Sequence, residues 1–250
     1  MTALRRHRGS RDMYETDLAW IQQRGFSDFA REATPGIVAA LRSAGFEGGR
    51  VVDLGCGSGV LLAALIEAGY AGVGVDVSAA LLELARETAP AAALVHGSAW
   101  DVDLPECVAV TAIGEVLCYL GEEGAEPPGL EPLFGRIAAA LRPGGLLLFD
   151  LIVAGAGEPM AYRSWREGEG WTVLVEVEED SEARRLRRRI VTFRRVDGAW
   201  RRGEEMHRVR VFDAALVTEA LGAAGFEVET STSWGASALA PRRLAFTARR

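Results

Sequence analysis

The segment VVDLGCGSG at residues 51–59 constrains the fold of this chain more than any other part of its sequence. A short apolar run, Val51–Leu54, leads into three glycines at alternate positions, and a helical pattern over 60–68 follows. Glycine lets the backbone turn sharply and approach a ligand more closely than a side chain would permit. We therefore expect a strand, a ligand-binding turn and a helix in succession, as at the start of an α/β sheet.

The same alternation of strands and helices continues along the chain. Further strands are predicted at 72–76, 93–96, 108–113 and 146–152, and further helices at 79–88 and 130–141. Ser78 is the predicted N-cap of the helix at 79–88. The strand at 146–152 is apolar up to Asp150, as in strands covered on both faces. This order predicts a doubly wound, mostly parallel sheet with right-handed crossovers.

Other patterns lie on either side of this core. Helices are predicted at 16–24 and 35–44, and the second is expected to begin at Pro35. Alternation with period two over 171–179, 187–196 and 202–212 predicts an antiparallel meander with ion pairs between acidic and Arg-rich segments. A helix at 213–224 and strands at 228–234 and 244–248 follow.

The chain is thus expected to have four parts. They are an N-terminal tail and helical lid at 1–45, an α/β core at 46–154, an antiparallel β insertion over the active site at 155–212, and a last helix with a terminal strand pair at 213–250.

Composition excludes several classes of function. A formal net charge of -7 argues against a nucleic-acid partner, because such proteins gather positive charge to release counterions. The 28 basic residues are all Arg, so no lysine Schiff base or P-loop lysine exists. Cys56, Cys107 and Cys118 have neither disulfide-framework nor zinc-site spacing. This spacing leads us to expect no bound metal. No apolar stretch near the length of a membrane span occurs, so we expect a cytoplasmic protein with no membrane contact.

The glycine turn and a carboxylate after it indicate a nucleoside-containing cofactor. Asp76 ends the second predicted strand, about twenty residues beyond the turn, where a carboxylate can accept hydrogen bonds from ribose hydroxyls. Dinucleotide enzymes use G-x-G-x-x-G, but Val60 occupies the third glycine position here. Asp53 followed by G-x-G-x-G instead resembles the first motif of class I S-adenosylmethionine-dependent methyltransferases.

This resemblance covers about 51–152 and extends to the last helix and strand pair. It implies a seven-stranded sheet of order 3-2-1-4-5-7-6 and S-adenosylmethionine as the cofactor. It also implies cofactor contacts from Asp53, Gly55, Cys56, Gly57, Gly59, Asp76, Val77, Ser98, Ala99, Trp100, Ile113 and Gly114. The family often has Asp where Ser98 stands, so Ser98, Asp101 or a backbone group remain alternatives for binding the adenine amine.

The acceptor is expected to be an amine or a hydroxyl group of a small molecule. An insertion and a lid that enclose the site suit a small substrate, by analogy at the level of the fold. The predicted fourth strand lacks the Asn-Pro-Pro-Tyr-like pattern of DNA amino methylation. No set of carboxylates marks a magnesium site.

Three residues are candidates for acceptor-side catalysis. Alternation places His207 on one face of the meander with Val209 and Val211, and if this face is turned to the core the imidazole can serve as a general base. A half-buried, hydrogen-bonded structural histidine is the alternative. Glu115 and Tyr119, after the fourth strand, are the further candidates. His96 ends a strand predicted to be buried.

Three rival functions remain open at this point. An NAD-dependent oxidoreductase would copurify with a different nucleotide. A non-catalytic S-adenosylmethionine-binding subunit would show no turnover as a monomer. An enzyme that uses S-adenosylmethionine itself as the substrate, for example by cyclisation, would release methylthioadenosine in place of S-adenosylhomocysteine.

Overall fold

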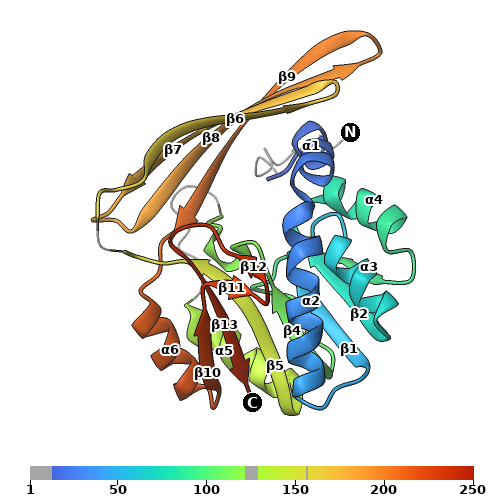
Figure 1. Ribbon diagram of the computed structural model, residues 1–250, viewed down its shortest axis with the longest axis vertical. Helices are drawn as coiled ribbons and strands as arrows, with labels where there is room; N and C mark the ends of the chain where they lie inside the picture. Colours follow the sequence, from blue (N-terminus) through green and yellow to red (C-terminus); the bar gives the residue numbers. More distant parts are fainter. Residues whose placement is uncertain (1–12, 122–128, 156) are drawn as a thin grey trace, which may run out of the picture.

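A computed structural model describes residues 13–121, 129–155 and 157–250 (Figure 1). The Arg-rich tail before Met13 lies outside them. The centre is a seven-stranded sheet of order β10-β13-β5-β4-β1-β2-β3. Its parallel strands along the chain are β1 (Gly49–Leu54), β2 (Tyr70–Asp76), β3 (Ala93–His96), β4 (Cys107–Ala112) and β5 (Leu141–Ile152).

The remaining two strands complete the predicted order. The strand β13 (Arg243–Arg249) runs antiparallel to β5, and β10 (Glu227–Ser231) runs antiparallel to β13. Among the seven strands of this sheet, β10 is the sixth along the chain and β13 is the seventh. Because β13 lies between β5 and β10, the order is 3-2-1-4-5-7-6 when only these strands are counted. The predicted fold class is therefore confirmed.

Helices cover both faces of the sheet. The helices α2 (Asp28–Ser43) and α3 (Val60–Glu67) pack with Val51 on one face, whereas α5 (Leu130–Ala140) and α6 (Ala214–Ala223) pack on the face that buries Val52. The two valines face opposite ways because strand side chains alternate. The helix α4 (Ala79–Thr88) begins at its predicted cap, where Ser78 Oγ accepts from the Leu81 N–H at 3.1 Å.

The insertion is a separate antiparallel sheet. It consists of β6 (Ala161–Gly168), β7 (Trp171–Asp180), β8 (Arg185–Val196) and β9 (Ala199–Arg210). Its inner face packs Trp171, Val173 and Ile190 against α1 (Thr16–Phe26), so this helix lies between the insertion and α4 (Figure 1). Its outer face carries ion pairs such as Arg187 with Glu178 at 2.7 Å, as predicted for this Arg-rich hairpin.

Several expectations are corrected. The meander has four strands, not three, because every residue of β6 is exposed and the strand has no apolar alternation that could reveal it. The second helix begins at Asp28, and Pro35 lies inside it, because burial of Ala33, Ile37 and Leu41 extends the helix across the sheet.

Two strands also differ from the prediction. His96 is exposed, since β3 is the edge strand of the sheet. The strand expected at 228–234 is divided, and its end forms a small hairpin of β11 (Ser233–Trp234) and β12 (Ser237–Ala238). None of the helices in the described part of the chain is long and apolar enough to cross a lipid bilayer.

Candidate active site

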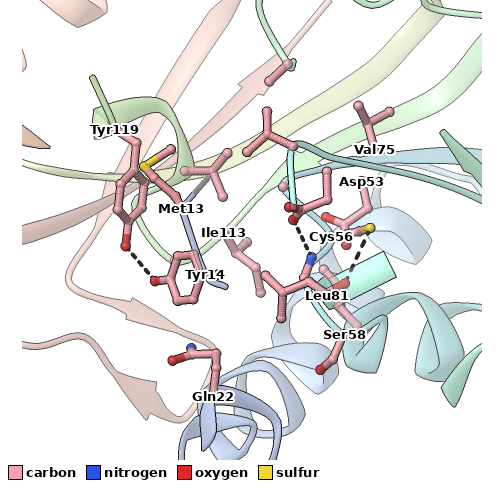
Figure 2. A pocket seen from close by; sticks show the side chains of 18 of the residues that line it. Met13, Tyr14, Gln22, Asp53, Cys56, Ser58, Val75, Leu81, Ile113 and Tyr119 are labelled. Atoms are coloured by element: carbon pink, nitrogen blue, oxygen red, sulfur yellow. Dashed lines mark hydrogen bonds between the residues drawn. The ribbon is translucent and has the colours of Figure 1, made fainter. Parts of the chain in front are cut away.

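A cavity of about 420 Å³ lies where the carboxyl ends of β1, β2 and β4 meet, and α1 and the start of α2 contribute to its opposite wall (Figure 2). Every predicted cofactor residue except Gly59 lines it. These residues are Asp53, Gly55, Cys56, Gly57, Asp76, Val77, Ser98, Ala99, Trp100, Ile113 and Gly114. The opposite wall includes Tyr14, Gln22, Phe29 and Tyr119.

The turn after β1 is shaped by Gly55, Gly57 and Gly59, whose φ angles of 67°, 55° and 79° are left-handed. The Gly55 N–H donates to the Val75 carbonyl oxygen at 2.7 Å, which ties the turn to β2. A Cβ added to Gly57 would meet no atom within 4 Å, so this glycine borders open space. Gly59 is buried outside the cavity, where a Cβ would lie 3.1 Å from Ala85 of α4.

Asp76 connects the end of β2 to this turn. Its Oδ2 accepts from the Gly57 N–H and its Oδ1 accepts from the Ser78 N–H, both at 2.8 Å. Burial raises the pKa of Asp76, although these backbone hydrogen bonds oppose the rise. A carboxylate has about four acceptor sites, so these contacts leave Asp76 able to accept from a ligand hydroxyl group.

Asp53 lies at the other side of the turn and is almost fully buried. Burial raises the pKa of this carboxyl group to about 7. The hydrogen bond that Thr111 Oγ1 donates to it at 2.6 Å acts in the opposite direction and lowers the pKa. The negative charge of Asp76 adds to the rise. A cationic ligand would favour the ionised form of Asp53, because opposite charges stabilise each other.

The segment after β3 forms the end of the cavity expected to hold adenine. Ser98 Oγ already accepts from the Trp100 N–H at 3.1 Å, whereas Asp101 also borders the cavity. Arg136 donates to the carbonyl oxygens of Trp100 and Val102 and thereby holds the segment. Since Ser98 Oγ is already engaged, the Asp101 carboxylate is more available than Ser98 to accept a hydrogen bond from a ligand.

Two tyrosines meet on the opposite wall. The hydroxyl groups of Tyr14 and Tyr119 lie 2.8 Å apart in a hydrogen bond (Figure 2). Burial raises the pKa of both phenols, that of Tyr14 well above its usual value, and the charge of Glu115 adds to the rise. Both phenols therefore remain protonated at neutral pH. No signal in the sequence indicates this pair, because Tyr14 and Tyr119 lie about a hundred residues apart in the chain.

Glu115 does not line the cavity. It lies just before the short 3₁₀ helix η1 (Val116–Cys118), and its carboxylate pairs with Arg188 of β8 and, at 2.8 Å, with Arg243 of β13. Burial alone would raise the pKa of Glu115, but the two guanidinium groups hold it below its usual value. This carboxylate therefore joins three elements and has no direct access to a ligand.

His207 is buried behind the two tyrosines and does not line the cavity either. Its ring centroid lies 5.0 Å from that of Tyr14 and 5.7 Å from that of Tyr119. Its Nε2 lies 2.8 Å from Glu205 Oε2. Of the three predicted catalytic residues, only Tyr119 borders the cavity.

A sheet of this order, with a glycine-rich turn after its first strand and an acidic residue at the end of its second, has the architecture of the class I S-adenosylmethionine-dependent methyltransferases. Residues 51–145 match the model of a family described as a methyltransferase domain. The match covers less than half of the chain, and this segment is similar to that family.

Individual known proteins support this assignment. The trans-aconitate 2-methyltransferase of Paracidovorax citrulli is 38% identical over 105 residues, which are 40% of this chain and 38% of that protein. The aligned part thus spans well under half of the curated relative.

Solved structures extend the similarity over the whole chain. The sugar N-methyltransferase KedS8 of Streptoalloteichus has a TM-score of 0.78 at 22% identity, with 100% of this chain and 99% of that one covered. The S-adenosylmethionine-bound CalS10 of Micromonospora echinaspora, an amino pentose methyltransferase, has a TM-score of 0.71 at 22% identity, with 98% and 100% covered. At this level of identity these two matches show the fold alone.

Residues 51–145 resemble a methyltransferase domain and the solved structures share this fold over the whole chain, which agrees with the predicted family, enzyme class and cofactor. The cavity fits S-adenosylmethionine in chemical terms. Gly57 leaves open space beside the backbone, Asp76 offers free acceptor sites for hydroxyl groups, and Asp53 can pair with a cation. The NAD-dependent alternative is not supported.

Proposed function

We propose that this protein transfers a methyl group from S-adenosylmethionine to an amino group of a small molecule. The observation that carries this proposal is the pair of protonated tyrosines, Tyr14 and Tyr119, on the cavity wall opposite the glycine turn. A hydroxyl group is the second candidate acceptor. A cytoplasmic location and the individual cofactor contacts remain predictions within this proposal.

The size of the cavity supports a small acceptor. Ligand sites in proteins typically measure about 300–1,000 Å³, and the cavity here, about 420 Å³, is at the lower end. It has to hold the cofactor and the reacting part of the acceptor together. The walls from α1 and from the turn after β4 leave little room for a folded macromolecule.

The two phenols favour an amine. S-adenosylmethionine supplies a methyl group on a positively charged sulfur. Tyr14 and Tyr119 can accept hydrogen bonds from the N–H groups of an amine and so direct its lone pair. Their raised pKa values make them poor general bases, so we expect orientation and proximity to contribute most, on the order of 7–11 kcal/mol.

The reaction balances without a protein base in direct contact with the acceptor. A neutral amine forms the new C–N bond as the C–S bond breaks, and the cationic product then releases its proton to solvent. The names of the structural neighbours, a sugar N-methyltransferase and an amino pentose methyltransferase, agree with an amine. The curated relative is named for trans-aconitate, which carries no amine, so a carboxylate belongs in the test.

The test incubates the purified protein with S-adenosylmethionine and, separately, amino sugars, other small amines, sugar alcohols and trans-aconitate. S-adenosylhomocysteine and the methylated product are then measured by mass spectrometry. We expect product with an amine and none with its hydroxyl analogue. Product only from an alcohol or a carboxylate would contradict the choice of acceptor, and methylthioadenosine formed without any acceptor would contradict methyl transfer itself.

A matched pair of variants links turnover to the pair of tyrosines. Tyr119→Phe removes one hydroxyl group of the pair, whereas Tyr70→Phe removes the hydroxyl group of a tyrosine that donates to the Phe46 carbonyl oxygen away from the cavity. We expect the first variant to lower kcat/KM for the amine about tenfold or more and the second to leave it unchanged. Equal activity of the two variants would remove Tyr119 from the acceptor site.

A further inference from the structure

A carboxylate of the insertion binds the backbone just ahead of α1. Glu205 of β9 accepts from the Tyr14 N–H at 2.8 Å and from the Glu15 N–H at 2.9 Å. The helix begins at Thr16 and has no side-chain cap of its own, and this carboxylate, about 190 residues away in sequence, binds the N–H groups of its N-cap residue Glu15 and of Tyr14 before it. A negative charge there is also favoured by the helix dipole.

His207 completes the arrangement. Because an ionised carboxylate can only accept, the imidazole Nε2, 2.8 Å from Glu205 Oε2, must carry the proton and donate it. Glu205 thereby accepts three N–H groups, and its side chain is only 11% exposed. The other ring nitrogen, Nδ1, is buried with no hydrogen-bond partner among the described residues. The imidazole does not line the cavity itself, and it contacts the residues there through Glu205, through a tilted packing on Tyr14 and through an edge contact with Tyr119.

Tyr14 is held at three of its atoms. Its N–H binds Glu205, its carbonyl oxygen accepts from Ser78 Oγ at 2.8 Å, and its hydroxyl group binds that of Tyr119. Its φ angle of 57° is left-handed, which is unfavourable for a bulky residue and persists only where the surroundings enforce it. Of the three side chains that hydrogen-bond to Tyr14, that of Glu205 is the charged one.

We infer that Glu205 and His207 are positioning residues that hold Tyr14 at the acceptor end of the cavity. That these residues hold Tyr14 rests on the contacts alone. That holding Tyr14 affects turnover rests on the proposed function. His207 in this role replaces the general base expected from the strand alternation. The insertion and the N-terminal helix then act as one unit, since the insertion supplies the charge that fixes the helix start.

The adjacent residue provides a matched control. Glu204 has the same side chain, but it points to the outer face of β9, where it pairs with Arg189 at 2.7 Å and with Arg202. Glu205→Gln places an amide against backbone N–H donors, whereas Glu204→Gln alters only the two ion pairs on the outer face. The comparison separates loss of the contact from a general loss of charge on this strand.

Hydrogen exchange of the backbone amides tests the contact without any acceptor. We expect exchange across 14–26 to become about tenfold faster or more in Glu205→Gln and in His207→Ala, and to be unchanged in Glu204→Gln. Affinity for S-adenosylhomocysteine, measured by calorimetry, should stay within about threefold in all three variants. Unchanged exchange in Glu205→Gln would overturn the inference.

Kinetics with an amine that the wild type methylates separates positioning from base catalysis. His207→Gln can still donate from a nitrogen at the place of Nε2 but cannot take up a proton. If His207 positions Glu205, this variant keeps kcat/KM within a few-fold and the same pH profile, while His207→Ala raises the KM of the amine. A loss of about a hundredfold or more in kcat for His207→Gln, with a changed acidic limb, would show a general base and overturn the positioning role. If the wild type methylates nothing, the proposed function fails, and the exchange experiment still decides the structural inference.

Discussion

Among single residues, the buried Asp53 carboxyl group has a pKa near neutral pH. Burial raises the pKa of Asp53 to about 7, against the hydrogen bond from Thr111 and with support from the charge of Asp76. The folded chain therefore holds this proton more tightly than the unfolded chain, whose Asp pKa is about 3.9. The contribution of Asp53 to stability consequently falls as the pH rises from about 4 to 7.

Binding of a cation should reverse this preference and release the proton. We expect affinity for S-adenosylmethionine to rise roughly tenfold between about pH 5.5 and 7.5, and Asp53→Asn to abolish most of this dependence. Calorimetry in buffers of different ionisation enthalpy measures the proton released on binding. Identical proton release by the wild type and the Asn variant would show that another group titrates.

The glycine turn offers a second prediction at this scale. Gly57→Val should abolish binding of S-adenosylhomocysteine without unfolding the protein, because the new side chain enters space that no protein atom occupies. Gly59→Ala is the control, since its Cβ presses on Ala85 outside the cavity and should lower stability more than affinity. Calorimetry and thermal unfolding of both variants provide the comparison. Normal binding by Gly57→Val would remove the turn from the cofactor site.

At the scale of elements, one buried carboxylate holds the insertion on the core. Glu115 joins the turn after β4 to Arg188 of β8 and Arg243 of β13, and Asp150 of β5 accepts from the Glu115 N–H at 2.8 Å. Glu115 therefore links four elements, three through its carboxylate and the fourth through its backbone N–H. The turn they fix carries Tyr119 to the cavity.

Breaking this cluster from one side should be costly. Arg188→Met is expected to lower the free energy of unfolding by about 3 kcal/mol, because removal of one partner leaves a buried charge poorly compensated. Arg187→Met, which breaks the exposed pair with Glu178, should cost at most about 1 kcal/mol. Urea unfolding at neutral pH measures both, and a similar small change in the two variants would contradict the role of Glu115. The pKa of Glu115 is lowered, so its stabilisation is present at neutral pH and is lost as the pH falls below the usual range of a glutamate.

At the scale of the whole molecule, the N-terminal helix closes the cavity from outside the sheet. The helix α1 packs on one side against the insertion and on the other side against α4, and its Gln22 and Phe26 line the cavity. From its aromatic residues and Gly25 we hypothesise that 13–29, within the lid expected at 1–45, is mobile. If ligands enter and leave the cavity on the side of α1, this helix has to move to let them pass.

Limited proteolysis with trypsin distinguishes a lid from a fixed wall. Cleavage after Arg24, which is exposed on α1, should slow about tenfold when S-adenosylhomocysteine is bound. Cleavage after Arg184, in the exposed turn between β7 and β8, serves as the internal reference and should not change. Equal rates at Arg24 with and without ligand would mean that α1 is a permanent part of the core.

Much of the core could be predicted because the signals are local. Strand and helix periods lie within single segments, the turn at 55–59 needs left-handed glycines, and Ser78 caps the helix that follows it. Asp76 could be placed because parallel strands end at the same edge of a sheet. The order of the sheet followed from the resemblance to a family with the same motif.

What only the tertiary structure decided are the contacts between distant segments. The pairing of Tyr14 with Tyr119, the hydrogen bonds of Glu205 to the start of α1, and the ion pairs of Glu115 depend on how the insertion docks on the core. An exposed strand such as β6 leaves no periodic apolar signal, and a side chain that alternates toward the core can meet either a ligand or another side chain. Alternation could assign His207 to the inner face, but only the packing of two tyrosines in front of it placed the imidazole outside the cavity.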